Sequence, residues 1–201
     1  AVLERLRRGF ADSGTPISEL RWAEATFELV TALTWVGRPD EAAEVALDAT
    51  GRVEPGSELE LWLQGIRAYP AAHLDDDATV QAAFVAISRA ASDTSALRLR
   101  TSVPARLVRA ARLGDDDLVD DAIGAGLEIE GARPMDPDLR CAWRVHAAEA
   151  RAACGDDAGA VELLDELLAQ LDELPHELPV HRLRHDALRA RLQPSSDSAV
   201  D

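Results

Sequence analysis

The chain has 201 residues, of which 47% are hydrophobic and 4% aromatic, and its formal net charge at pH 7 is −16. The apolar content excludes an intrinsically disordered chain, and the scarcity of aromatic residues disfavours a β-rich fold. The negative charge disfavours direct binding to nucleic acid or to an anionic membrane, because both ligands carry charge of the same sign.

The first part of the chain predicts a short helix over residues 1–10 and then a helical hairpin within residues 17–50. We expect the helices of this hairpin to cover 17–36 and 39–50. Gly37 can adopt the left-handed backbone conformation that ends a helix, and Pro39 suits the first position of the next helix.

A second hairpin is predicted within residues 57–92. Ser57 and Glu60 have the spacing of a capping box, which favours a helix start at this point. Pro70 is expected to end or kink the first helix near Tyr69. Three aspartates at 75–77 stand where the second helix would begin, a position at which acidic residues are favourable.

The remaining sequence predicts two more hairpins, within residues 95–129 and 137–173, followed by a capping helix over 179–192 and a polar tail over 194–201. Pro104 leaves two alternatives for the third hairpin: a kinked first helix, or one that starts late, from Ser102. Aspartates at 115–117 precede its second helix. The fourth hairpin follows a loop over 131–137 and turns at Gly155.

The same pattern of apolar and small residues surrounds each of the four turns. The turn residues, which we call the nodes, lie 38, 39 and 41 positions apart: Gly37, Asp75, Gly114 and Gly155. Apolar or small residues recur seven and one positions before each node, and five, nine and twelve positions after it. A helical hairpin repeated with such a period is typical of a solenoid, in which stacking buries faces that one hairpin would expose.

Two stretches resemble tetratricopeptide repeats, in the run from Leu33 to Ala49 and in the run from Ala148 to Leu164. Both carry glycine at the node, an acidic pair and then alanine. The other two hairpins depart from this pattern, with Asp75 in place of glycine and valine at 80 and 119. The resemblance covers about residues 17–173. The longer, degenerate repeats of this chain are similar to those in the helical regions of large bacterial transcription regulators and of peptide-sensing regulators. This resemblance implies a segment that binds a protein, a peptide or a small inducer, without ATPase or DNA-binding parts of its own.

The candidate partner-binding residues are Arg106, Arg109, Trp62, Trp143 and Arg144. Arg106 and Arg109, together with Arg112, step along one helix and could bind a carboxylate or phosphate of a ligand. The alternative is that these arginines pair with the nearby aspartates. The tryptophans could line a groove, where such residues dominate binding energy, or fill the gaps between stacked helices.

The sequence also offers candidates for metal binding and for catalysis. His181 and His185 stand four apart and could share a helix face for a metal, but the alternative is an ordinary polar face. The aspartate runs lack the spacing of a calcium loop, and no nucleophile–histidine signature is present. We therefore expect no metal, no cofactor and no catalytic residues. With only two cysteines, Cys141 and Cys154, we expect reduced thiols rather than a disulfide framework. The sequence contains no 18-residue apolar run of the kind that a membrane-spanning helix needs.

The sequence thus predicts one all-α domain over residues 1–201, a right-handed α-solenoid of about four tetratricopeptide-like hairpins. Its expected function is that of a protein- or peptide-interaction scaffold or sensor in a cytoplasmic bacterial regulator, acting through the concave face. Sensing of a small-molecule inducer is the alternative, and a homodimer is an assembly that the sequence leaves open. Arginine as the sole strong base, with abundant alanine, is typical of a GC-rich genome such as an actinobacterial one, and the first residues resemble the interior of a longer protein.

Overall fold

A computed structural model of the chain describes residues 19–90, 98–132, 137–172 and 179–192. These residues form helices and the turns between them, with no β-strand among them, so the predicted all-α class is confirmed for the described chain. The helix predicted over 1–10 and the tail over 194–201 lie outside the described residues. Contacts divide the chain into two compact units, Ala1–Ala105 and Arg106–Asp201. The single domain predicted for 1–201 remains a prediction, and each unit is described by itself.

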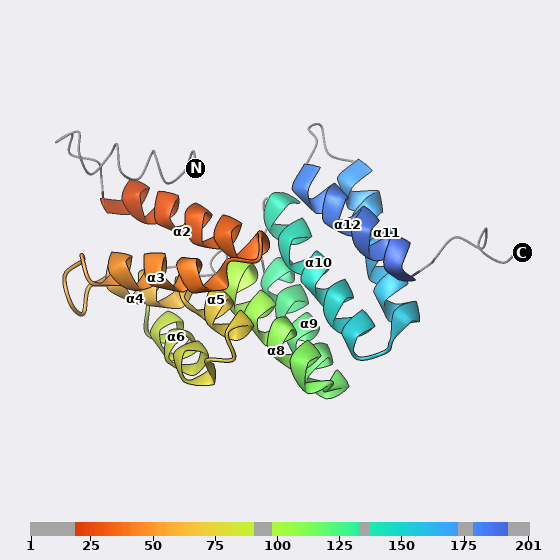
Figure 1. Ribbon diagram of the computed structural model, residues 1–201, viewed down its shortest axis with the longest axis horizontal. Coiled ribbons are helices and arrows are strands. Elements are labelled where there is room, and N and C mark those ends of the chain that lie inside the picture. Colours follow the sequence, from red (N-terminus) through yellow and green to blue (C-terminus); the bar gives the residue numbers. More distant parts are fainter. Residues whose placement is uncertain (1–18, 91–97, 133–136, 173–178, 193–201) are drawn as a thin grey trace, which may run out of the picture. The chain divides into compact units, whose positions relative to one another are not determined.

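The first unit contains two hairpins (Figure 1). Helices α2 (Glu19–Trp35) and α3 (Pro39–Thr50) form the first, and α4 (Glu58–Ile66), α5 (Ala68–His73) and α6 (Asp77–Arg89) form the second. One apolar cluster joins α2, α3, α4 and α6, and its buried members are Ala23, Phe27, Val30, Ala42, Ala46, Ala49, Leu63, Ile66 and Ile87. Four of these nine side chains are alanines, three of them on α3, which allows the neighbouring helices to approach α3 closely.

The start of α4 follows its predicted cap, with one difference. The Ser57 hydroxyl accepts a hydrogen bond from the Glu60 backbone N–H at 3.1 Å, as a capping box requires. The Glu60 carboxylate accepts from the backbone N–H of Gly56 rather than from that of Ser57. The prediction of a helix start at Ser57 is therefore confirmed, and Glu60 satisfies a backbone donor one residue earlier than expected.

Pro70 interrupts the first helix of the second hairpin, but the interruption lies before the position that the sequence predicted. Helix α4 ends at Ile66 and α5 begins at Ala68, so the break is at Arg67 rather than near Tyr69. Proline lacks an N–H, and its ring clashes with the carbonyl four residues earlier, which here belongs to Ile66. The disturbance therefore falls one turn ahead of the proline, and Pro70 itself stays helical.

Pro104 acts in a similar way at the start of the third hairpin. A π-helical turn, η1 (Arg98–Ser102), leads directly into α8 (Val103–Leu113). The wider π turn accommodates the missing hydrogen bond and the proline ring, so the first helix is continuous and irregular rather than late-starting. The division between the two units falls within α8.

The second unit contains α9 (Asp116–Gly131), α10 (Pro137–Ala153), α11 (Asp157–Asp172) and α12 (Pro179–Leu192). The bounds of α12 match the predicted capping helix. Helices α10, α11 and α12 share an apolar cluster whose buried members are Cys141, Val145, Ala148, Leu164, Leu167, Leu171 and Leu188. Helix α12 lies beside α11 (Figure 1), and its Leu188 belongs to this cluster.

All four nodes adopt the same backbone conformation. Their φ angles are +75° at Gly37, +60° at Asp75, +63° at Gly114 and +89° at Gly155. At each node the backbone N–H that follows bonds to the carbonyl five residues earlier, as in a Schellman motif: Arg38 to Leu33, Asp76 to Ala71, Asp115 to Ala110, and Asp156 to Arg151. In the last three turns this same aspartate then caps the next helix through its side chain. The four turns are therefore one structure repeated, including the turn in which aspartate replaces glycine.

Residues at the same offset from the four nodes are also buried to a similar extent. The residues seven before, five after and twelve after each node are buried in all four hairpins. Those nine after are buried or half-buried. The apolar residue just before the node is less buried, because Val36 and Leu113 are 68% and 54% exposed and Leu74 and Cys154 are half-buried. This position belongs to the helix end, whereas the other offsets form the packing face of each hairpin.

The left-handed turn predicts opposite effects for two substitutions. Asp75→Gly is expected to stabilise the chain by about 0.5 kcal/mol, because the relief of an unfavourable φ exceeds the greater flexibility of glycine in the unfolded state. Gly155→Ala is expected to destabilise it by about 1 kcal/mol, because alanine is strained at φ +89°. Urea unfolding of the two variants measures both effects. Destabilisation by Asp75→Gly would contradict this account of the second turn.

Candidate functional site

Trp62 lies on α4 in the first unit and is only partly exposed. It packs against the apolar cluster of that unit, and its ring centroid is 5.9 Å from that of Phe27, with the two planes inclined by 50°. The guanidinium of Arg100 lies 5.3 Å from the centroid of the same Phe27 ring and forms an ion pair with Glu28 at 2.6 Å. Trp62 therefore contributes to the core and retains some surface for contact with a partner.

Trp143 lies in the second unit, with no exposed surface. Gly126 of α9 faces its ring so closely that a Cβ atom there would lie 3.0 Å from three ring carbons. The indole Nε1 donates a hydrogen bond to Glu130 Oε1 at 2.8 Å. The ring thus fills the space between α9 and α10, as in the core alternative of the sequence interpretation.

Arg144 is the neighbour of Trp143 and is also buried, at 7% exposure. Two of its nitrogens donate to the two carboxylate oxygens of Glu130, at 2.6 and 2.8 Å. Its guanidinium carbon lies 5.1 Å from the Trp143 ring centroid. This paired geometry satisfies a charge that would otherwise be costly to bury, so Arg144 and Glu130 link α9 to α10.

The arginines of α8 differ from Arg144 in their accessibility. Arg106 and Arg112 are exposed and Arg109 is half-buried, and each of the three has an interaction partner within the chain. Among the five predicted binding residues, the structure therefore brings together Trp143 and Arg144. Arg106 and Arg109 lie on α8, and Trp62 belongs to the other unit.

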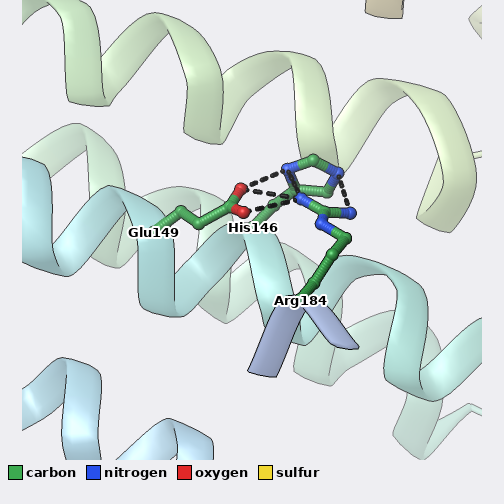
Figure 2. Close-up of polar contacts among 3 residues, drawn as sticks. All are labelled: His146, Glu149 and Arg184. Carbon is green, nitrogen blue, oxygen red and sulfur yellow. Dashed lines mark hydrogen bonds and ion pairs between the residues drawn. The ribbon is translucent and has the colours of Figure 1, made fainter. Parts of the chain in front are cut away.

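One polar cluster was not predicted: His146 and Glu149 of α10 with Arg184 of α12 (Figure 2). His146 is 4% exposed, and its Nδ1 lies 3.1 Å from Glu149 Oε2. Arg184 Nη2 donates to both oxygens of Glu149, at 2.9 and 2.8 Å, and the two Nη atoms lie 3.3 and 3.2 Å from the His146 ring nitrogens. The His–Glu spacing of three is visible in the sequence, but Arg184 is distant along the chain.

These neighbours change the acidity of Glu149. Burial alone would raise the pKa of its carboxyl group. The hydrogen bond from His146 and the positive charges of His146 and Arg184 outweigh burial, and they lower the pKa from 4.5 to about 2. Glu149 is therefore ionised through the whole physiological range and holds Arg184, and with it α12, against α10.

The lowered pKa predicts a pH dependence of stability. A carboxyl group with a lower pKa in the folded state stabilises the fold above its unfolded pKa, near 4.5, and this contribution is lost as the pH falls toward 2. Because the Glu149 side chain is 39% exposed, we expect a screened contribution of about 1–2 kcal/mol. In urea unfolding, the stability difference between the wild type and Glu149→Gln should shrink by that amount from pH 5 to pH 2. A difference that does not change with pH would contradict this role.

The two histidines considered as metal ligands, His181 and His185 of α12, are buried, with 2% and 4% of their surface exposed. His185 Nδ1 lies 2.8 Å from Asp186. Among the residues that the structure describes, no group of three histidine, cysteine or acidic side chains is placed to hold a metal ion. These histidines therefore lie in the contact of α12 with its neighbours and not on a polar surface.

Comparison of the chain with protein-family models, with curated proteins and with solved structures gave no match. Within the part of the chain that is described, no helix has the length and apolar character needed to cross a membrane.

Proposed function

We propose that this chain is a protein- or peptide-interaction segment built as a right-handed stack of tetratricopeptide-like hairpins. The observation that supports it is the identity of the four turns: each has a positive φ, a Schellman hydrogen bond and the same buried offsets around it. Repeated hairpins of one geometry stack into extended surfaces, and such surfaces bind proteins and peptides. We propose that the segment is part of a cytoplasmic bacterial regulator, because its sequence resembles the helical repeat regions of such proteins.

The proposed contact surface includes the arginines of α8. Arg106 is exposed and Arg109 is half-buried, three residues apart on one helix. In a chain of net charge −16, such a pair is a local site for the carboxylates of a partner. Trp62, which is partly exposed, is a separate candidate on the first unit, whereas Trp143 and Arg144 stabilise the second unit from inside.

Charge reversal tests this surface. We expect at least one partner captured from the source organism to be lost, or to bind at least tenfold more weakly, when Arg106→Glu and Arg109→Glu are combined. Arg38→Glu combined with Arg52→Glu is the matched control, because it makes the same charge change at exposed sites whose ion pairs are with Glu41 and Asp48. If the variant of Arg106 and Arg109 retains every partner that the control retains, the proposed surface is wrong. A gain in melting temperature with a metabolite, and none with proteins, would favour inducer sensing instead.

A further inference from the structure

Helix α12 docks on the second unit through a small apolar contact surrounded by ion pairs. Leu188 of α12 is buried in the cluster shared with α10 and α11, and Leu192 packs against that cluster. Arg184 pairs with Glu149 of α10, Arg182 donates to Asp172 of α11 at 2.7 Å, and Arg189 pairs with Asp165 of α11. We call the side chains that hold α12 the α12-docking face: Cys141, Val145, Ala148, Glu149, Leu164, Asp165, Leu167, Leu171 and Asp172.

The charges of the two surfaces are complementary. The α12-docking face carries three acidic side chains and no basic one, and Glu149, Asp165 and Asp172 each pair with an arginine of α12. Helix α12 carries four arginines, at 182, 184, 189 and 191, and one aspartate. An acidic face with an apolar centre selects a helix that has apolar residues on one side and arginines beside them.

The fit of α12 to this face is incomplete. His181 and His185 are buried in the contact, and His185 Nε2 has no hydrogen-bond partner among the described residues. A buried polar atom without a partner opposes docking, because the atom loses its water and gains nothing in return. A helix with an apolar side chain in place of His185 would keep the arginine pairs and would bury no polar atom without a partner. Such a helix would therefore compete with α12.

We propose that the α12-docking face is a binding site for a basic amphipathic helix of a partner protein, and that α12 is its displaceable internal occupant. The proposal rests on the proposed role in protein interaction but uses a surface separate from the α8 arginines. Docking of α12 lowers the apparent affinity for the partner, because only molecules with α12 released can bind it. The partner is identified by its chemistry: leucine-type residues on one face, flanked by arginines that match Glu149, Asp165 and Asp172.

The test uses a dye-labelled peptide with the sequence of residues 179–192 as the probe, and fluorescence anisotropy with the full chain. Leu188→Ala weakens α12 and leaves the docking face intact, so it should bind the peptide at least tenfold more tightly than the wild type. Leu183→Ala is the matched control, because Leu183 stands on the same helix and is 71% exposed; it should bind as the wild type does. A peptide in which Arg182, Arg184 and Arg189 are replaced by glutamate should bind at least tenfold more weakly.

Equal binding by Leu188→Ala and Leu183→Ala, or by the two peptides, would overturn the proposal. If Leu188→Ala does not fold, hydrogen exchange of the wild type tests whether α12 is displaceable. The backbone amides of α12 should then exchange faster than those of α11. Equal protection of the two helices would overturn the proposal. Sedimentation should show a monomer; a dimer that Leu188→Ala abolishes would make a second copy the occupant and refute the partner assignment. If the peptide does not bind but partners are still captured through Arg106 and Arg109, this inference fails and the proposed function stands.

Discussion

Replacement of Trp143 by alanine is expected to lower the free energy of unfolding by about 3–5 kcal/mol, the range for a large buried aromatic side chain. The ring is fully buried between α9 and α10, and its Nε1 donates to Glu130. Alanine would leave a cavity opposite Gly126, where there is no side chain to fill it. A whole domain has about 5–15 kcal/mol of stability, so the variant should be largely unfolded under mild denaturing conditions.

A double-mutant cycle with Gly126 tests the reason for this effect. Gly126→Ala alone should cost about 1–3 kcal/mol, because the new methyl group would meet the six-membered ring of the indole at 3.0 Å. Phenylalanine at 143 extends less far, so Gly126→Ala should cost less in a Trp143→Phe background. Urea unfolding measures all four proteins. A Trp143→Ala variant with the stability of the wild type would show that Trp143 does not act as a core residue.

The second large effect is expected at the Glu130–Arg144 pair. Glu130→Gln should destabilise the protein by about 3–5 kcal/mol, because it leaves the Arg144 guanidinium buried without a countercharge. The two side chains are only 11% and 9% exposed, so water cannot replace the carboxylate. Glutamine still offers an oxygen to Trp143 Nε1, which isolates the effect of the charge.

Two further variants test whether the loss of stability in Glu130→Gln comes from the unpaired buried charge of Arg144. Adding Arg144→Met to Glu130→Gln removes the unpaired charge and should recover at least half of the lost stability, because a buried pair is often replaceable by apolar groups. Glu41→Gln breaks the exposed pair with Arg38, whose side chain is 55% exposed, and should cost less than about 1 kcal/mol. If Glu130→Gln costs no more than Glu41→Gln in urea unfolding, the pair is not a structural link between α9 and α10.

Much of the helical framework could be predicted because its signals are local. Gly37, Gly114 and Gly155 mark the left-handed turns directly, and the bounds of α12 follow from Pro179 and the end of its apolar pattern. The position of Asp75 in the same turn was predictable only from the repeat, since aspartate is less suited than glycine to a positive φ.

The misplaced features depend on contacts that the sequence does not display. Pro70 signals a break, but the site of the break depends on the carbonyl one turn earlier. Arginine is an exposed residue by default, and the carboxylate that allows Arg144 to be buried belongs to another helix. For the same reason, the link between Glu149 and Arg184 was not foreseen, although His146 and Glu149 have helical spacing.

The repeat relationship among the four hairpins is the central claim, and a crystal structure of this chain tests it most directly. The measurement is the rotation and translation that superimpose each hairpin on the next, with Gly37, Asp75, Gly114 and Gly155 aligned. A right-handed stack predicts nearly the same operation for all three steps, with the first helix of each hairpin on one concave face. Three unrelated operations, or hairpins gathered around a single central bundle, would contradict the claim and remove the proposed binding surface.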